Sequence, residues 1–505
     1  MTGAKAKRAR GLRPDSSQAV PASPPSNRRW KPWLWLLGLA VIFLFIEYWV
    51  PLATSIKLGT DEDFELSKVL LYLKGYHLYS EVWDDQPPLY TWLLAHLVRP
   101  YSLAILPARL LTVGLTLLLL GSFFRLIVNL GNLRTAVGAT ALLIAAPGFL
   151  ELASSCMVEI PTVSFVLAAL AWLSRPGAHR WPWREIGAGA LFGVALQIKG
   201  IALVYGPLMV LLLWLKYRPP FKQLILSTAV IGLTSVAAFI SLNALTGYGL
   251  GLQLQQAWAS HFAGTRSFEY GSPAEHVFDL KLLFKNWDVM VPVLAGVGFL
   301  ITQIRSKPLT IFPLAWLVLT ATVISTHRPW WGCYYLHNAI PLCWCAAMVL
   351  DAAFDWAGSR KVRTILLAAY LMAAGLWMGI RSYLEVAAMR HSPQVFNSLV
   401  LSEINRYKPF TKYMFATEEI YTFHAGIPMP PSLAQITLKR FWSGDLTNEK
   451  LADELAAIKP GVILTGNQVG ELPYSALLQR DYRLVYQDNE HQLYALKTIS
   501  RLANQ

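Results

Sequence analysis

The sequence is poor in charge, and this scarcity argues against an ordinary soluble protein. Asp, Glu, Lys and Arg make up only 15% of its 505 residues, whereas hydrophobic residues make up 54%. A soluble chain of this length needs a larger polar share to cover its surface. The run Trp33–Val50 contains a single acidic residue, Glu47, and is close to the roughly 20 apolar residues that cross a bilayer. The composition therefore predicts a polytopic α-helical membrane protein.

Cysteine is also scarce, and no CxxC motif is present. The four cysteines are Cys156, Cys333, Cys343 and Cys345, and none lies in the hydrophilic C-terminal part. Cys343 and Cys345 are two residues apart in an apolar run, so on a helix they point in different directions. We interpret all four as packing residues rather than as a disulfide framework or a metal site.

Basic residues outnumber acidic ones and give a formal net charge of +14, but their positions do not indicate a nucleic-acid partner. They cluster in short segments between apolar runs, as the positive-inside rule predicts for cytoplasmic loops. Residues 1–31 form a basic tail with Pro and Ser, which we expect to be disordered in the cytoplasm. The lipid bilayer, and no nucleic acid, is the expected partner of these charges.

Apolar runs separated by charged loops predict about eleven transmembrane helices. Each loop that this topology places in the cytoplasm is basic, and the long or acidic loops fall on the other face. The predicted spans are Trp33–Val50, Ala104–Val128, Ala136–Leu150, Ile160–Leu173, Ile186–Ile198, Ile201–Leu215, Leu224–Leu245, Val289–Ile304, Leu309–Ser325, Tyr334–Leu350 and Ile365–Ile380.

This topology divides the chain into three parts. The tail 1–31 is cytoplasmic, residues 32–380 form the membrane domain, and residues 381–505 form an extracytoplasmic domain. Two long outer loops, 51–103 and 246–286, interrupt the membrane domain.

The C-terminal part changes composition and predicts a small α/β domain. The stretch 446–458 has a helical pattern, and Gly461–Thr465 is typical of a short buried strand. The segments 483–486 and 492–496 predict a hairpin around Asp488-Asn489.

The stretch Thr60–Leu89 concentrates acidic residues beside the first span, which is unusual in a chain with so few charges. Between its two acidic clusters, an apolar pattern predicts a short helix at the membrane surface that ends at Gly75. The second cluster precedes the rigid Pro87-Pro88 pair. The acids of the two clusters are Asp61, Glu62, Asp63, Glu65, Asp84 and Asp85.

Further charged or titratable residues are expected at the same membrane face, where a charge is costly and suggests function. An acid there can deprotonate an acceptor hydroxyl or hold a divalent metal. A Lys or Arg can neutralise a phosphate leaving group. Besides the acidic clusters, the candidates are Glu151, Glu159, Lys199, His261, Arg266 and His337.

Simpler explanations compete for several of these residues. The first acidic cluster could be a solvated loop, and Glu159, just before Pro161, is typical of a helix start. Lys199 could extend to the lipid headgroups. His261 and His337 could be hydrogen-bonded structural histidines. The aromatic group Trp330, Trp331, Tyr334 and Tyr335 fits an interface belt as well as a sugar-stacking surface.

Several short motifs occur in an order that resembles a known family. Asp61-Glu62 follows the first span, and Lys74-Gly75-Tyr76 forms a Gly-aromatic turn. The segment 85–89 has the pattern acid-x-Pro-Pro-Leu, and 157–161, Lys199-Gly200 and 335–341 follow. On these motifs, residues 33–380 resemble the polyprenyl-phosphate-dependent GT-C glycosyltransferases, which include protein O-mannosyltransferases and bacterial aminoarabinose–lipid A transferases.

The resemblance implies a GT-C-like enzyme of the bacterial inner membrane. Such an enzyme transfers a sugar from a polyprenyl-phosphate carrier, with inversion, to an acceptor on the periplasmic face. The acceptor could be a protein, lipid A or a cell-envelope glycan. By resemblance the expected catalytic residues are Asp61, Glu62 and Asp85, with Asp61 as the general base and Asp85 positioning the acceptor or a divalent metal. The resemblance also implies that Lys199 contacts the carrier phosphate.

One departure from the family pattern concerns the phosphate site. Gln86 stands where family members often have Lys, and this removes one cation. Arg266 or His261 in the long outer loop could replace it. The full set expected to bind substrate is Asp84, Glu159, Lys199, His261, Arg266, Tyr335 and His337.

Two other functions also fit a charged membrane protein. A transporter or flippase of a lipid-linked sugar needs charges near the membrane, although such proteins often show inverted repeats, and none is visible in this sequence. A non-catalytic partner in polysaccharide assembly would tolerate changes of its acidic residues.

Overall fold

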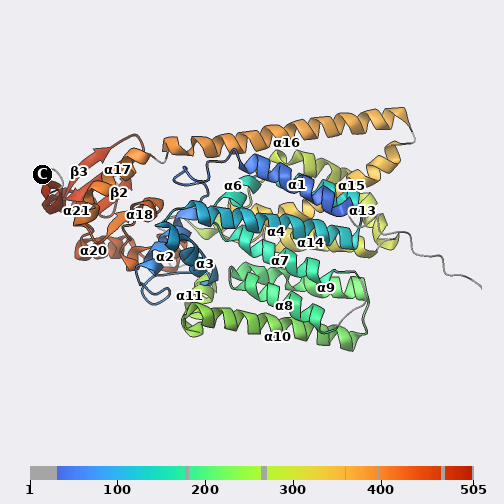
Figure 1. Ribbon diagram of the computed structural model, residues 1–505, viewed down its shortest axis with the longest axis horizontal. Helices are drawn as coiled ribbons and strands as arrows, with labels where there is room; N and C mark the ends of the chain where they lie inside the picture. The colour runs from blue at the N-terminus through green and yellow to red at the C-terminus, as the bar shows by residue number, and fades with distance from the viewer. Residues whose placement is uncertain are drawn as a thin grey trace, which may run out of the picture.

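The computed structural model describes residues 31–176, 181–262, 270–306, 308–358, 360–395, 397–467 and 472–502. It consists of a bundle of long helices with a small sheet-containing domain at one end (Figure 1). The predicted basic tail up to residue 30, Arg266 and the side chain of His261 lie outside the described part.

The helices of the bundle follow the predicted apolar runs, each of which overlaps one of them. Within the described residues, six helices are apolar and at least 18 residues long, enough to cross a membrane, and four others are apolar but shorter. The bundle contains α1 (Lys31–Glu47), α4 (Leu106–Leu130), α5 (Leu133–Ile144), α7 (Glu159–Leu173), α8 (Trp183–Leu196), α9 (Gly206–Tyr217), α10 (Phe221–Thr246), α13 (Trp287–Ser306), α14 (Ile311–Val323), α15 (Tyr335–Ala357) and α16 (Lys361–Val395).

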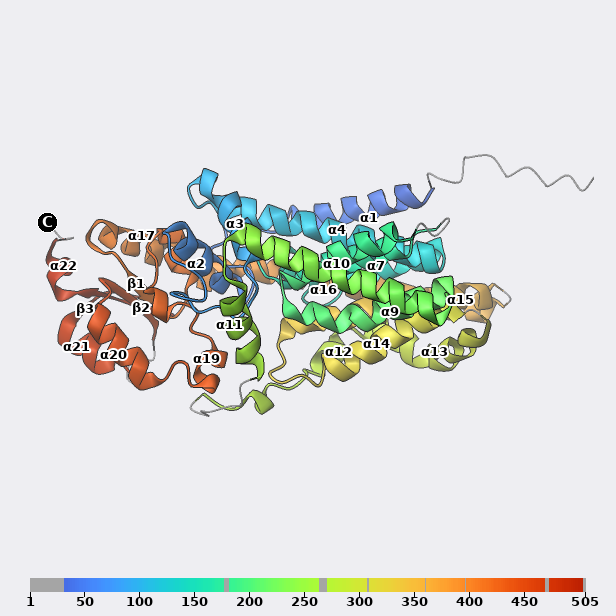
Figure 2. The ribbon, with the colours of Figure 1, turned by 90° about the horizontal axis from the view of Figure 1, so that it is seen from below.

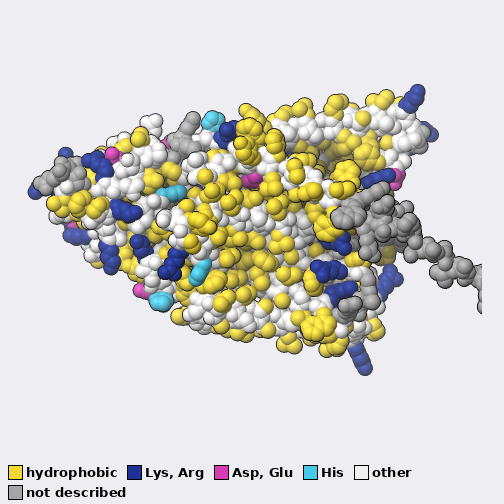
Figure 3. All heavy atoms as spheres, in the orientation of Figure 1, with side chains coloured by type: hydrophobic (Ala, Val, Ile, Leu, Met, Phe, Trp, Pro, Cys, Tyr) yellow, Lys and Arg dark blue, Asp and Glu magenta, His cyan; other side chains and the backbone are white. Residues whose placement is uncertain are grey.

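The outside of the bundle is apolar. Large side chains such as Phe45, Leu233 and Met372 are 64%, 72% and 73% exposed. On the face drawn in Figure 3, apolar side chains cover the bundle, and Lys and Arg gather toward its two ends. Lipid accepts an apolar surface of this extent, whereas water does not. The chain is a multi-pass membrane protein.

The acid-rich stretch folds between the bundle and the C-terminal domain. Its helix α2 (Glu62–Leu73) ends just before Gly75, whose φ of +91° favours glycine. The sequence predicts a helix at the membrane surface, but nine of the 12 residues of α2 are buried. The reason is that α3 (Leu89–Val98) and α18 (Ile420–Ala425) pack against it.

Short helices connect the longer ones, and several of them lie at the end of the bundle near α2. They are η2 (Arg99–Tyr101), α6 (Phe149–Ser154), η3 (Gly200–Tyr205), α11 (Leu250–Phe262), η4 (Pro273–Glu275), α12 (Lys281–Lys285), η5 (Pro308–Thr310) and η6 (Gly332–Tyr334).

The C-terminal domain is built on four strands, β1 (Met414–Ala416), β2 (Val462–Gly466), β3 (Tyr482–Gln487) and β4 (His491–Leu496), which form one sheet with the order β1-β2-β4-β3. The central strand β2 pairs in parallel with β1 and antiparallel with β4, where Ile463 lies opposite Tyr494. The predicted helix, buried strand and hairpin correspond to α20, β2 and the pair β3–β4. The elements are α17 (Ser398–Tyr407), η7 (Lys408–Phe410), β1 (Met414–Ala416), α18, η8 (Pro431–Leu433), α19 (Leu438–Ser443), α20 (Asn448–Ile458), β2 (Val462–Gly466), α21 (Ser475–Asp481), β3 (Tyr482–Gln487), β4 (His491–Leu496) and α22 (Lys497–Leu502).

Candidate active site

A buried ion pair anchors the start of the acid-rich stretch to the bundle. Arg109, in the first turn of α4, is fully buried, and its Nε and Nη2 donate to the two carboxylate oxygens of Glu62 at 2.9 and 2.7 Å. Its Nη1 also donates to the carbonyls of Leu52 and Ser55, both at 2.8 Å. A bidentate guanidinium–carboxylate pair fixes orientation as well as distance. The loop 52–62 is therefore held at one place on α4.

The surroundings of Glu62 keep its carboxylate ionised. Burial alone would raise the pKa of Glu62, but the charge and hydrogen bonds of Arg109 outweigh burial and hold this pKa below its ordinary value. The backbone amides of Leu58 and Cys156 add hydrogen bonds at 2.8 and 3.1 Å. All of these partners belong to the protein, so Glu62 serves to position the loop.

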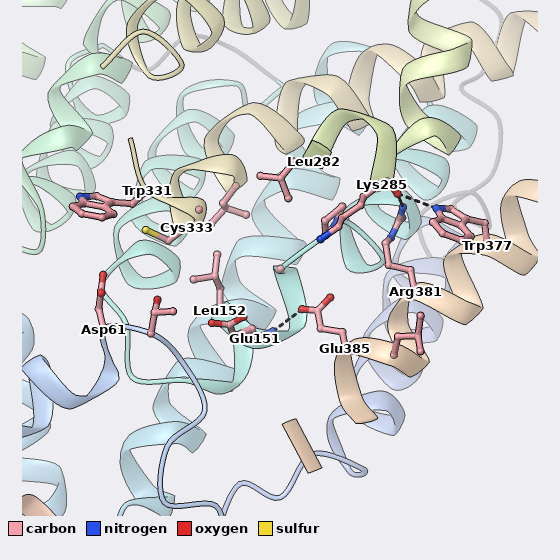
Figure 4. A pocket seen from close by; sticks show the side chains of 16 residues that line it. Asp61, Glu151, Leu152, Leu282, Lys285, Trp331, Cys333, Trp377, Arg381 and Glu385 are labelled. Atoms are coloured by element: carbon pink, nitrogen blue, oxygen red, sulfur yellow. Dashed lines mark hydrogen bonds between the residues drawn. The ribbon is translucent and has the colours of Figure 1, made fainter. Parts of the chain in front are cut away.

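Asp61, the residue before this anchor, has a different environment. Its side chain is half-buried and does not cap α2, and it makes no hydrogen bond or ion pair with the described residues. Figure 4 shows its carboxylate pointing toward Trp331 and Cys333. Burial raises the pKa of Asp61 to about 7, with a further contribution from Glu159, while Lys199 opposes the shift. A carboxylate with this pKa can accept a proton near neutral pH.

Asp61 lies where two cavities meet. The large cavity, of about 720 Å³, extends between α6, α12, α15 and α16 (Figure 4). The small cavity, of about 290 Å³, extends toward the C-terminal domain. Asp61, Trp331 and Cys333 line both cavities. A molecule in either cavity can therefore reach the same carboxylate.

The small cavity is lined by lysines from separate parts of the chain. Lys199, just before η3, forms an ion pair with Glu159, and its ammonium lies 5.1 Å from the centre of the Tyr334 ring. Lys439, from α19, pairs with Asp85 at 2.6 Å. Lys68, from α2, lines the same cavity. Lysines around one chamber can bind a phosphate group, and the carboxylates of Asp61, Glu65 and Asp85 line this chamber as well.

Asp84 and Asp85 are adjacent in sequence but occupy different places. Asp84 is buried and accepts from Lys68 and from the amide of Gln86, both at 3.0 Å. Burial raises the pKa of Asp84 to about 7 although Lys68 opposes the shift. Asp85 lines the small cavity, where Gln86 Nε2 donates to its Oδ1 at 3.0 Å. Asp85 is thus the member of this pair that faces open space.

The large cavity has polar groups among apolar walls. Arg381, on α16, donates to the two carboxylate oxygens of Asp288 at 2.7 and 2.9 Å. One turn further, Glu385 accepts from the amide of Glu151 at 2.9 Å. The apolar part of the lining includes Leu152, Leu282, Leu336, Trp377 and Leu384. This mixture suits a ligand with both polar and apolar parts.

Several residues that the sequence analysis expects at the site line neither cavity in the described structure. Each of them has at least one polar partner inside the protein; for example, Asn286 donates to the hydroxyl of Tyr335 at 2.8 Å, and the ring of His337 is hydrogen-bonded to Tyr205. The residues concerned are Glu62, Asp84, Glu159, Tyr335 and His337.

The cavities also contain residues that the sequence analysis does not single out as site residues. Lys439 is one, because nothing local in its segment indicates that the C-terminal domain folds back onto the first outer loop. Arg381 and Glu385 lie just beyond the last predicted span, and their place in the apolar helix α16 is the signal that could have marked them. Cys333, interpreted as a packing residue, lines both cavities.

No family model and no curated protein matches the sequence, but solved structures do match the fold. ArnT from Cupriavidus metallidurans bound to undecaprenyl phosphate is similar over 91% of this chain and 98% of its own, with 15% identity and a TM-score of 0.66. The Archaeoglobus fulgidus oligosaccharyltransferase matches 93% of this chain and 75% of its own, with 12% identity and a TM-score of 0.56. The chain has the GT-C fold.

Within this GT-C fold, the described residues do not assemble a metal site. No group of three His, Cys, Asp or Glu side chains comes together among them in a way that could hold an ion. Asp85, the expected ligand, is paired with the ammonium of Lys439 instead. A zinc complex has been solved for the Archaeoglobus fulgidus oligosaccharyltransferase, but the donor set around Asp85 does not fit such an ion.

The anchoring pair predicts a large effect on stability. Replacing Arg109 with Met should lower the free energy of unfolding by about 3–5 kcal/mol, because Glu62 would remain buried without its partner. Thermal unfolding of the detergent-solubilised protein, followed by tryptophan fluorescence, measures the change. Arg134→Gln is the control, since Arg134 and its partner Asp355 are 70% and 78% exposed. Equal melting temperatures for both variants and the unmodified protein would contradict this role of Arg109.

Proposed function

We propose that this protein is a membrane glycosyltransferase that moves a sugar from a polyprenyl-phosphate carrier to an acceptor. The observation that carries this proposal is the Asp61 carboxylate, which lies at the junction of a small cavity lined by lysines and a large cavity of mixed polarity. The carrier class is supported by two proteins of the same fold, since ArnT was solved with undecaprenyl phosphate and the archaeal oligosaccharyltransferase AglB with a dolichol-phosphate.

In the proposed reaction the two substrates meet at Asp61. The donor places its phosphate in the small cavity, and the acceptor enters from the large cavity. Asp61 takes the proton of the acceptor group while that group attacks the anomeric carbon. The bond between this carbon and the phosphate oxygen breaks, and its electron pair leaves with the polyprenyl phosphate. Attack opposite the leaving group inverts the anomeric carbon.

Lys199 stabilises the leaving phosphate in this proposed reaction. Its ammonium faces the small cavity and is fixed by Glu159 and by the ring of Tyr334. A fixed cation stabilises the negative charge that develops on the leaving phosphate, and it needs no reorganisation during the step. Glu159 therefore acts through Lys199 and positions it, without touching the donor.

We propose the bacterial inner membrane as the location, with the N-terminus in the cytoplasm and the C-terminal domain in the periplasm. Helices α7 and α9 begin near the site and end beside Arg175, Arg184 and Lys216. Contacts of Lys216 with Ser174 bring these basic loops together at the end away from the site. Positive charge on that face favours a cytoplasmic orientation. The parts 1–31, 32–380 and 381–505 then serve as tail, membrane domain and periplasmic domain.

Replacing Asp61 with Asn should lower the transfer rate at least about 100-fold, because the acceptor loses its base. The protein in nanodiscs is incubated with polyprenyl-phosphate-linked pentoses and hexoses and with an extract of envelope lipids and proteins. Mass spectrometry then measures the released polyprenyl phosphate. Asp63→Asn is the matched control, since Asp63 belongs to the same cluster but is paired with Lys57 at 2.7 Å. Normal turnover by Asp61→Asn would refute the assignment of the base, and a donor left intact by the unmodified protein would favour a flippase.

The transfer rate should also rise with pH through neutrality. Only the deprotonated form of Asp61 accepts a proton, and its pKa is raised to about 7. The rate at pH 6 should therefore be about one tenth of the plateau reached above pH 8. Because Lys199 lowers the pKa of Asp61, Lys199→Gln should move this rise in transfer rate to higher pH. A rate independent of pH between 5.5 and 8 would contradict the proposal.

A further inference from the structure

The C-terminal domain contributes one wall of the small cavity. This wall is the segment 435–439, which ends at the start of α19. Figure 2 shows α19 at the border between the domain and the bundle. Gln435 ties the segment to α2, because its Nε2 donates to the carbonyl of Phe64 at 2.6 Å. Its φ of +62° is a conformation that residues other than glycine rarely adopt, so the segment is held in a defined path.

Contacts of α19 direct Lys439 toward the junction of the cavities. Lys439 and Trp442 are three residues apart and share one face of the helix. The Trp442 ring is nearly parallel to that of Trp331, at 10° and 6.4 Å between centres, and its Nε1 donates to the carbonyl of Gly271 at 3.0 Å. Arg440, on a different face, is buried among acceptors of its own domain. The helix therefore presents Lys439 to the cavity and Arg440 to the domain.

Lys439 and Lys199 face the same cavity from opposite sides of the domain border. The Lys439 ammonium pairs with Asp85 at 2.6 Å, and Lys199 is close enough to oppose its positive charge. An ammonium group has three N–H donors and can share them among several acceptors. An anion placed between the two ammonium groups would remove their repulsion and accept from both. Asp61, Glu65 and Asp85 also line this cavity, so the place between the two ammonium groups, and not the cavity as a whole, suits an anionic ligand with several acceptor oxygens.

We infer that Lys439, supplied by the C-terminal domain, binds the carrier phosphate together with Lys199. This inference rests on the proposed function. The donor is a phosphodiester with one negative charge, and the phosphate gains a second when the bond to the anomeric carbon breaks. A second fixed cation stabilises that increase in charge. The phosphate site is then incomplete without the C-terminal domain.

The test is binding of polyprenyl phosphate, without sugar, to the full-length protein in nanodiscs. Lys439→Gln should weaken this binding at least tenfold, because a charge-assisted contact to the phosphate is lost. The same variant should bind polyprenol, which lacks the phosphate, as the unmodified protein does. Lys459→Gln is the matched control, since it removes a half-exposed lysine of the same domain that pairs with Asp481. Unchanged affinity of Lys439→Gln for polyprenyl phosphate, or equal losses for both lipids, would overturn the inference.

Moving the positive charge of Lys439 to a neighbouring position distinguishes a phosphate contact from a purely structural role. Gln86 lines the same cavity and donates to the other oxygen of Asp85, so Gln86→Lys places an ammonium on the opposite side of that carboxylate. Added to Lys439→Gln, it should restore most of the affinity for polyprenyl phosphate. If Lys439→Gln does not fold, Lys439→Gln/Asp85→Asn removes the ion pair as a unit. That double variant should still bind polyprenyl phosphate at least tenfold more weakly, and normal affinity there would overturn the inference.

The binding readout distinguishes this inference from the proposed function. If Lys439→Gln loses affinity for polyprenyl phosphate while the unmodified protein transfers no sugar, Lys439 keeps its assignment and the transferase proposal fails. Suppose instead that the unmodified protein transfers sugar, and that Lys439→Gln binds polyprenyl phosphate and transfers sugar as well as the unmodified protein. The transferase proposal then stands, and the assignment of Lys439 is wrong.

Discussion

The fully buried pair of Arg109 and Glu62 is the interaction on which the site depends. Its guanidinium also holds two carbonyls of the preceding loop, so a single side chain fixes the path of the chain from the end of the first span into α2. Asp61 is the neighbour of this anchor and owes its position to it. Glu62, whose partners all belong to the protein, thus fixes the position of Asp61. Asp61 has no such partner among the described residues and lies at the junction of the two cavities. The proposed chemistry uses this difference between the two acids.

The long helix α16 joins the bundle to the C-terminal domain. Within the bundle it carries Arg381 and Glu385 into the large cavity, and beyond the bundle it leads into the domain that carries Lys439. Because α2 is packed under α18, the C-terminal domain is part of the site and not a separate module.

Much of the architecture could be predicted from the sequence because it depends on local patterns. Apolar runs mark the bundle helices, and the periodicity of 446–458 and of the final hairpin marks α20, β3 and β4. Asp61, Asp85 and Lys199 could be placed near one membrane face because the charges of the loops indicate which side of the membrane each loop faces. What could not be predicted is which acid would find a partner: Glu62 and Asp84 look like Asp61 in sequence, and only the positions of Arg109 and Lys68 distinguish them. Lys439 depends on contacts between segments far apart in the chain, which no local pattern reveals.

The central claim is that donor and acceptor meet at Asp61, and an experimental structure tests it most directly. The Asp61→Asn variant, trapped with an intact polyprenyl-phosphate-linked sugar, is the complex to determine. The account predicts the sugar at the junction of the two cavities, with its anomeric carbon beside residue 61 and its phosphate about 3 Å from the Lys199 ammonium. A sugar bound at the opposite end of the bundle, or a phosphate in the large cavity, would contradict the account.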